Sequence, residues 1–213
     1  IKFITVAIDS EASAGGGTQA KLISKYYNLY YLDTGKIYRY IAYLKKKNPK
    51  KFGYIFLKKK LNHLKTSDLR KKSLLSEQIG LIASQIAKKI KIRKLVNKFQ
   101  IKCAYYPPKR FNGSCLDGRD ITTKIMPRAM FKFFIYASLK IRAKRRYLEL
   151  KKLNNGVSLK EVQKSIEFRD KSDYERKHSP LKRTKDQVLI NSSKLSKKAC
   201  FFKIKKIMDK KLN

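Results

Sequence analysis

The stretch Ile4-Thr-Val-Ala-Ile-Asp-Ser-Glu-Ala-Ser-Ala-Gly-Gly-Gly-Thr18 decides how the chain folds. Its short apolar run, Ile4 to Ile8, is bounded by turn residues, a pattern typical of a buried strand. Three consecutive glycines and Thr18 follow, and a helix-like segment continues from Gln19 to Tyr27. Glycines let backbone N–H groups converge, and a helix start favours anions. The stretch therefore predicts a strand, a phosphate-binding loop and a helix, although a flexible strand-to-helix turn would leave the same pattern.

The loop departs from the usual phosphate-binding pattern, GxxxxGK[ST]. The first glycine of the pattern is Ser10, and the lysine position holds Gly16. The pattern alone is therefore a weak match, and the motifs that follow along the chain decide its interpretation.

Three further motifs follow in a fixed order. Asp33-Thr-Gly-Lys-Ile-Tyr-Arg39 comes directly after a second apolar run, Tyr30 to Leu32. Leu116-Asp-Gly-Arg-Asp-Ile121 and Glu167-Phe-Arg-Asp-Lys-Ser-Asp-Tyr-Glu-Arg176 come later, and Ser179-Pro-Leu181 follows the last of them. In this order and spacing, over nearly its whole length, the chain resembles the bacterial cytidylate kinases, which are nucleoside monophosphate kinases. The family loop normally reads Gly-Lys-Gly-Thr, whereas this chain has Gly15-Gly-Gly-Thr18.

The expected fold is α/β, because strands alternate with helices along the chain. The resemblance implies a P-loop kinase fold with a central, mostly parallel five-stranded sheet, helices on both faces, and nucleotide-binding and lid subdomains. We expect one domain, with a core at 1–35, 112–157 and 186–213, a monophosphate-binding region at 36–111, and a lid at about 158–185. Residues 50–76 show no alternating strands, so the small β insert common in this family is expected to be shortened or replaced by helix.

Arginines are the expected chemistry of the site. Phosphoryl transfer between two phosphates needs alignment and charge neutralisation more than acid–base groups, and the guanidinium fork binds phosphate oxygens bidentately. A single arginine in so basic a chain is usually a solvated surface group, but those inside the motifs are expected in the cleft. The resemblance implies that the acceptor phosphate is bound by Thr34, Arg39, Arg119 and Arg176, with Asp33 at the same CMP site.

The base and the sugar of the acceptor have their own expected contacts. By the resemblance, Ser84, Arg93 and Asp120 read the cytosine, whose N4 amino group donates while O2 and N3 accept. Ser84 could instead be a helix-face hydroxyl, and Asp120 a structural partner of Arg119. Arg169 and Asp173 are four residues apart and share a helix face, so they either form an ion pair or contact the sugar hydroxyls from a closing lid.

ATP is the donor that the resemblance implies, with Mg²⁺ bound by its phosphates and by water, so no metal ligand is assigned to the protein. The loop residues expected at ATP are Ser10, Glu11, Ala12, Ser13, Ala14, Gly15, Gly16, Gly17 and Thr18. The missing lysine leaves a charge to be supplied from elsewhere. The family usually has a small apolar residue where this chain has Lys36, so Lys36 is the proposed substitute, with Lys21 a weaker alternative. Together with Arg39, Arg119 and Arg176, Lys36 completes the expected catalytic set.

The net charge of +39 requires a second hypothesis, because basic chains can bind nucleic acid by releasing counterions. The lysines are spread along almost every segment, which indicates compositional drift and weak non-specific binding instead of a specific nucleic-acid partner. No apolar run is long enough to span a bilayer, so no membrane partner is expected. Cys103, Cys115 and Cys200 are odd in number and match no zinc spacing, which favours the reducing cytoplasm.

Three functions are consistent with the sequence. The first is an active kinase that converts CMP or dCMP to the diphosphate in pyrimidine nucleotide metabolism. The second is a degenerate homologue that binds nucleotide with little turnover, and the third is a basic nucleic-acid-binding protein. The acceptor motifs are intact, which favours the first, and the resemblance implies a monomer.

Overall fold

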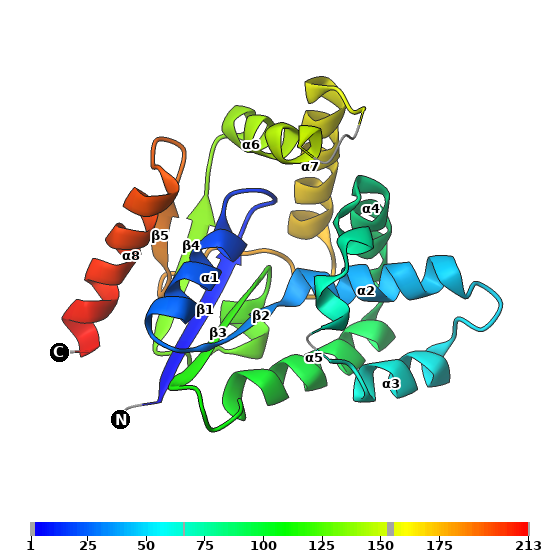
Figure 1. Cartoon of the computed structure of the whole chain (residues 1–213), viewed down its shortest axis with the longest axis horizontal. Helices are drawn as coiled ribbons and strands as arrows, with labels where there is room; N and C mark the ends of the chain where they lie inside the picture. The colour runs from blue at the N-terminus through cyan, green and yellow to red at the C-terminus, as the bar shows by residue number, and fades with distance from the viewer. Residues whose placement is uncertain (1–2, 66, 153–155, 213) are drawn as a thin grey trace.

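A sheet of five strands organises the chain (Figure 1). The computed structural model describes residues 3–65, 67–152 and 156–212. The strands lie in the order β2-β3-β1-β4-β5, and every neighbouring pair is parallel. Their bounds are β1 (Ile4–Ser10), β2 (Tyr30–Asp33), β3 (Gly113–Gly118), β4 (Phe131–Tyr136) and β5 (Val188–Asn191). The expected five-stranded α/β fold is confirmed, and its sheet is parallel throughout.

The central strand, β1, places the loop that follows it. All seven of its residues are buried, as expected for a parallel sheet with helices on both faces. The carboxyl ends of parallel strands share one edge, and the crevice outside that edge is where such sheets bind ligands. β1, β2 and β3 end at Ser10, Asp33 and Gly118, so three of the sequence motifs meet there.

Each face of the sheet has its own apolar core. On one face, α1 (Gly16–Tyr26) and α8 (Lys197–Leu212) pack Ile23 and Ile204 against Ile8 and Phe133 of the strands. The other core joins Ala7, Leu32 and Leu116 of the strands to α2 (Thr34–Lys47), α4 (Glu77–Ile86) and α5 (Ile90–Tyr105).

The segment between α2 and α4 is helical. It contains α3 (Tyr54–Asn62) and two short 3₁₀ helices, η1 (Asp68–Arg70) and η2 (Lys72–Leu75). Leu57, Leu61 and Leu74 anchor it in the same core as α2 and α5. The expectation that helix replaces the family's β insert is confirmed for the described part of this segment.

Two helices, α6 (Leu139–Lys151) and α7 (Leu159–Glu175), lie above the carboxyl edge of the sheet, over the loop that follows β1 (Figure 1). They share a small apolar core, formed by Ala143, Leu150, Val162 and Ile166, into which Ala12 of the loop inserts. A capping box starts α7, because Ser158 accepts from the backbone of Glu161 and the Glu161 side chain accepts from that of Ser158. The loop is therefore attached directly to these two helices.

The cysteines, the absence of a membrane span and the division into regions were also predicted from the sequence. Cys103, Cys115 and Cys200 are buried and form no disulfide. None of the described helices combines the length and the apolar character needed to cross a bilayer. The division into core, monophosphate-binding and lid regions stays a prediction.

Candidate active site

Two pockets open at the carboxyl edge of the sheet. The larger has a volume of about 810 Å³ and lies against the loop after β1, the ends of β2 and β3, and parts of α6 and α8. The narrower one, of about 80 Å³, lies between α2, α4, α5 and α7. Both pockets are lined by Gly35, Arg39, Gly118, Arg119 and Arg169. Molecules bound in the two pockets would therefore meet at a boundary that contains three arginines.

The loop forms one wall of the larger pocket. The lining includes eight of the nine expected residues, namely Ser10, Glu11, Ser13, Ala14, Gly15, Gly16, Gly17 and Thr18. Ala12 is fully buried, and its N–H donates to Asp170 of α7, so this residue anchors the loop instead of lining the pocket. Gly15 precedes α1 with a φ of 98°, a conformation that favours glycine. The start of α1 offers unpaired N–H groups to an anion at this wall.

Ser10 and Gly16, which hold the first-glycine and lysine positions of the usual pattern, lie against each other. A Cβ at position 16 would stand 2.4 Å from the Ser10 Oγ and 2.7 Å from the Ser10 Cβ. The loop consequently has no room for a lysine at position 16 while Ser10 is present.

Several cations from outside the loop line the larger pocket. Lys36 is half-buried in the first turn of α2, and its ammonium group forms no ion pair or hydrogen bond with the described residues. Arg145 is engaged, since it donates to the Oγ and carbonyl oxygen of Ser192. Arg146 is held by Glu77, at 2.6 Å between Nη2 and Oε1. Four lysines line this pocket without an ion pair or side-chain hydrogen bond to the described residues: Lys21, Lys36, Lys152 and Lys197.

Two of the carboxylates that line the larger pocket lie on strands, Asp33 at the end of β2 and Asp117 near the end of β3. Asp33 accepts from the Lys36 backbone N–H and so caps α2, while Asp117 accepts from the Tyr31 hydroxyl at 2.9 Å. Burial, and then the negative charge of Asp33, raises the pKa of Asp117 to about 8. Asp33, expected at the acceptor, therefore lies on the wall of the larger pocket in this structure.

One end of the narrower pocket contains a buried ion pair. Arg93 Nη2 lies 2.5 Å from Asp120 Oδ2, with the two side chains only 3% and 6% exposed. Arg176 Nη2 is 4.0 Å from the other carboxylate oxygen of Asp120. Tyr38 Oη, Arg93 Nε and Arg176 Nη2 are buried without a hydrogen-bond partner among the described residues. Unpaired buried polar groups are costly, so this end is suited to a ligand that is itself rich in donors and acceptors.

At the boundary of the two pockets, Arg39 is held by backbone carbonyl groups. Its Nη1 donates to Leu74 at 2.8 Å and to Ser76 at 3.0 Å. Gly80 leaves room for it, because a Cβ there would lie 2.7 Å from the Arg39 Nη2. Burial, and then the nearby charges of Arg169 and Arg146, lowers the pKa of Arg39 to about 10. A phosphate among these cations would relieve their repulsion.

Arg169 and Asp173 do not form the i,i+4 ion pair that their spacing allows. Asp173 instead accepts from Arg119 Nε at 2.8 Å and from Arg176 Nη1 at 3.1 Å. Arg169 forms no ion pair among the described residues, and burial followed by the charge of Arg119 lowers its pKa. Thr34, the remaining expected contact, lines the narrower pocket while its hydroxyl donates to the Asp117 carbonyl oxygen at 2.8 Å.

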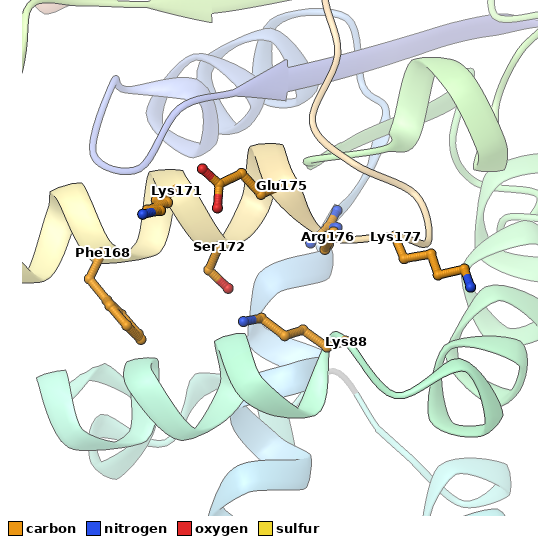
Figure 2. A pocket seen from close by; sticks show the side chains of 7 residues that line it. All are labelled: Lys88, Phe168, Lys171, Ser172, Glu175, Arg176 and Lys177. Carbon is orange, nitrogen blue, oxygen red and sulfur yellow. The ribbon is translucent and has the colours of Figure 1, made fainter.

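Ser84 connects the narrower pocket to a groove on its outer side. Its hydroxyl lines the pocket and donates to the Ser172 hydroxyl of α7 at 3.0 Å. Beyond Ser172 the groove between α4 and α7 has a volume of about 430 Å³. Figure 2 shows Phe168, Lys171, Ser172 and Glu175 along α7 opposite Lys88, with Arg176 and Lys177 at the far end. Since Arg176 borders both spaces, α7 separates the groove from the pocket.

The sequence motifs did not reveal every residue of the site. Tyr38 falls inside the Asp-Thr-Gly-Lys-Ile-Tyr-Arg motif but was assigned no role. Glu77 joins α4 to α6 through Arg146 and to α7 through Ser165, at 2.9 Å. Asp170 binds both the Ala12 N–H and Arg142 of α6. The sequence offered a signal for both acidic residues. Glu77 directly follows the Ser76 cap, and Asp170 lies inside the Arg-Asp-Lys-Ser-Asp run.

Comparison with known proteins identifies the family. The family described as Cytidylate kinase matches residues 6–210, from β1 to α8. The chain belongs to the cytidylate kinase family. It is 37% identical to a cytidylate kinase of Bartonella tribocorum, over 94% of this chain and 92% of that protein. It is also 36% identical to a cytidylate kinase of Thermosipho melanesiensis, over 97% of each. The resemblance read from the motifs is thus confirmed, and both pockets lie within the residues that match the cytidylate kinases.

A solved structure supports the fold. An uncharacterized protein from Eubacterium ventriosum aligns with a TM-score of 0.57 at 18% identity, over 97% of this chain and 98% of that one. At this identity the likeness concerns the fold alone.

Proposed function

We propose that this chain transfers the γ-phosphoryl group of ATP to CMP or dCMP, giving ADP and CDP or dCDP. The observation that carries the proposal is the boundary of the two pockets, where Arg39, Arg119 and Arg169 each line both. In-line transfer between two phosphates needs this arrangement, with the reacting groups side by side and positive charge between them. Membership in the cytidylate kinase family supports the choice of substrates.

The narrower pocket is proposed as the acceptor site. The base lies at the end formed by Arg93, Asp120 and Ser84, where a carboxylate and nearby donors match the cytosine edge. Arg176 is close enough to Asp120 to contribute at this end as well. The acceptor phosphate lies toward Thr34, Arg39 and Arg119. Asp173 positions Arg119 and Arg176 by accepting from both, and Arg169 faces the phosphates and the sugar.

The larger pocket is proposed as the ATP site. The start of α1 and the glycines of the loop contact the donor phosphates through their N–H groups. Mg²⁺ bound to these phosphates would neutralise part of their charge and hold them in a fixed geometry. Asp33 and Asp117 face the same pocket. Burial, and then the negative charge of Asp33, raises the pKa of Asp117, and a cation bound here would relieve the repulsion between the two carboxylates.

Lys36 is proposed to supply the charge that the loop lacks. It lines the donor pocket, is half-buried, and has no partner among the described residues. A lysine stem reaches roughly 6 Å and carries a mobile point charge, as a loop lysine does. The site therefore keeps a lysine near the transferred phosphoryl group, but this lysine is on α2 instead of in the loop.

A coupled assay for ADP tests the reaction. With ATP, Mg²⁺ and CMP or dCMP we expect turnover, and with UMP a lower rate. Well-folded protein that forms no ADP above background with any pyrimidine monophosphate would leave the degenerate nucleotide-binding homologue as the better interpretation.

Lys36→Ala tests the substitute cation. Loss of one charge-stabilising contact is expected to lower kcat by roughly tenfold to a hundredfold. Lys45→Ala, on the same helix and exposed, is the matched control and should retain full activity. Restoring a loop lysine needs Ser10→Gly together with Gly16→Lys, since Ser10 fills the space, and this pair should rescue Lys36→Ala. Full activity of Lys36→Ala would refute the role.

The oligomeric state, location, metabolic role and partners of the chain are proposed from the resemblance to the cytidylate kinases. We propose that the chain acts as a monomer in the cytoplasm, in pyrimidine nucleotide metabolism, without a specific nucleic-acid partner. Gel filtration with light scattering tests the first of these.

A further inference from the structure

Ser10 and Gly16 lie against each other within the loop after β1. Ser10 ends β1 and Gly16 begins α1, so the loop folds back and brings them together. The distances for a Cβ built at position 16 are 2.4 Å to the Ser10 Oγ and 2.7 Å to the Ser10 Cβ. Rotation about χ1 of Ser10 would move the Oγ, but the Cβ is fixed by the backbone. Relief of the overlap would therefore require the loop itself to move.

In this loop conformation, a side chain at position 16 would overlap that of Ser10. A lysine at position 16 would overlap Ser10 unless the loop moved, whereas a glycine at position 10, as in the usual loop pattern, would leave this space free. This chain has serine at position 10 and glycine at position 16, a pair that avoids the overlap. The missing glycine and the missing lysine are therefore sterically linked.

We infer that Ser10 is a donor-phosphate-binding residue, whose side chain occupies the space where the Cβ of a loop lysine would stand; this rests on the proposed ATP site. Ser10 lines the donor pocket, is 4% exposed, and its hydroxyl has no hydrogen bond to the described residues. A hydroxyl in this place can donate one hydrogen bond to a phosphate oxygen but brings no charge. Ser10 consequently keeps a hydrogen bond from the loop to the donor phosphates, whereas the positive charge is supplied by a residue outside the loop.

Thermal unfolding of the ligand-free protein tests the overlap. Gly16→Ala adds only the Cβ, and Gly16 does not adopt a positive φ, so backbone strain is not introduced. Overpacking typically costs about 1–3 kcal/mol, which lowers Tm by roughly 3–10 °C in a chain of this size. In a Ser10→Gly background the same substitution should lower Tm by less than about 2 °C. Gly53→Ala, where a Cβ meets nothing within 4 Å, is the control and should leave Tm unchanged in both backgrounds.

Calorimetric binding of a non-hydrolysable ATP analogue with Mg²⁺ tests the hydroxyl. Ser10→Ala keeps the Cβ and removes the hydrogen bond, so affinity for the analogue should fall about fivefold while affinity for CMP stays the same. Ser10→Thr, which keeps a hydroxyl, should bind the analogue more tightly than Ser10→Ala.

The outcomes separate the inference from the proposed function. An equal Tm loss for Gly16→Ala in both backgrounds would refute the overlap, and unchanged analogue affinity in Ser10→Ala would refute the contact. If the parent binds the analogue and both effects are seen but CMP is not phosphorylated, the proposed reaction fails and the role of Ser10 stands.

Discussion

Asp120→Ala should damage both the fold and the choice of base. Asp120 lies 2.5 Å from Arg93, and both side chains are almost completely buried. Removal of one partner leaves a buried guanidinium without its counter-charge, which typically costs about 3–5 kcal/mol. In a protein of this size each kcal/mol lowers Tm by roughly 2–4 °C, so we expect a Tm loss on the order of 6–20 °C.

An ion pair with an exposed carboxylate supplies the control. Lys132 pairs with Asp186, whose side chain is 57% exposed. Exposed pairs contribute about 0–1 kcal/mol, so Asp186→Ala should lower Tm by only a few degrees. Thermal unfolding of the two variants under the same conditions compares a buried with an exposed carboxylate directly.

Steady-state kinetics at a temperature where Asp120→Ala is folded give the second measurement. KM for CMP should rise and the preference for CMP over UMP should shrink, whereas KM for ATP should change little, because the carboxylate lies in the narrower pocket. A Tm loss no larger than that of Asp186→Ala would refute the argument from burial. Equal losses for CMP and for ATP would refute the placement of Asp120 at the base.

Three further predictions concern other parts of the molecule. Because burial and Asp33 raise the pKa of Asp117 to about 8, the folded protein binds more protons than the unfolded chain between about pH 4 and 8. The free energy of unfolding should therefore fall as pH rises through this window. Urea unfolding at pH 5 and 8 should show a smaller fall for Asp117→Asn than for the parent protein. An identical fall in the two proteins would exclude Asp117 as the cause. Ser84→Ala should raise KM for CMP several-fold, about 1 kcal/mol of binding, whereas Ser172→Ala should not; equal effects would indicate that Ser84 acts only by bonding to α7. Single-stranded RNA should bind weakly without sequence preference and lose at least tenfold in affinity between 50 and 200 mM salt, as filter binding can measure, and sequence-selective binding at high salt would revive the nucleic-acid hypothesis.

The sequence was most informative where local pattern and chemistry agree. The apolar run at Ile4–Ile8 was sufficient to predict a strand, because buried parallel strands are short continuous apolar runs. The later run Val188-Leu-Ile190 also predicted a strand, although only Ile190 of β5 is buried. The helical replacement of the β insert could be predicted from the lack of alternation between residues 50 and 76. The arginines in the motifs could be assigned to one cleft, since bidentate phosphate binding predicts their convergence.

The pairing of side chains could not be predicted from spacing. Arg169 and Asp173 are one helical turn apart, yet Asp173 binds Arg119 from another segment, because the burial of both groups favours the closer tertiary partner. The contact between Ser10 and Gly16 depends on how the loop folds back, which residue types alone do not specify. Charge is also less even than the composition suggests: residues 34–116 carry 23 lysines and arginines but only Asp68 and Glu77 as carboxylates.

Around the narrower pocket, positive and negative side chains alternate in a continuous row. Arg93 binds Asp120, Asp120 faces Arg176, and Asp173 accepts from both Arg176 and Arg119. Members of such a network do not contribute independently, because each substitution changes what its neighbours can pair with. The loss of stability from two substitutions in this row will therefore differ from the sum of their separate losses. The effect of a substitution at one position will depend on which residue occupies the next. Residues from three distant segments behave as one unit, which can be replaced as a whole more readily than member by member.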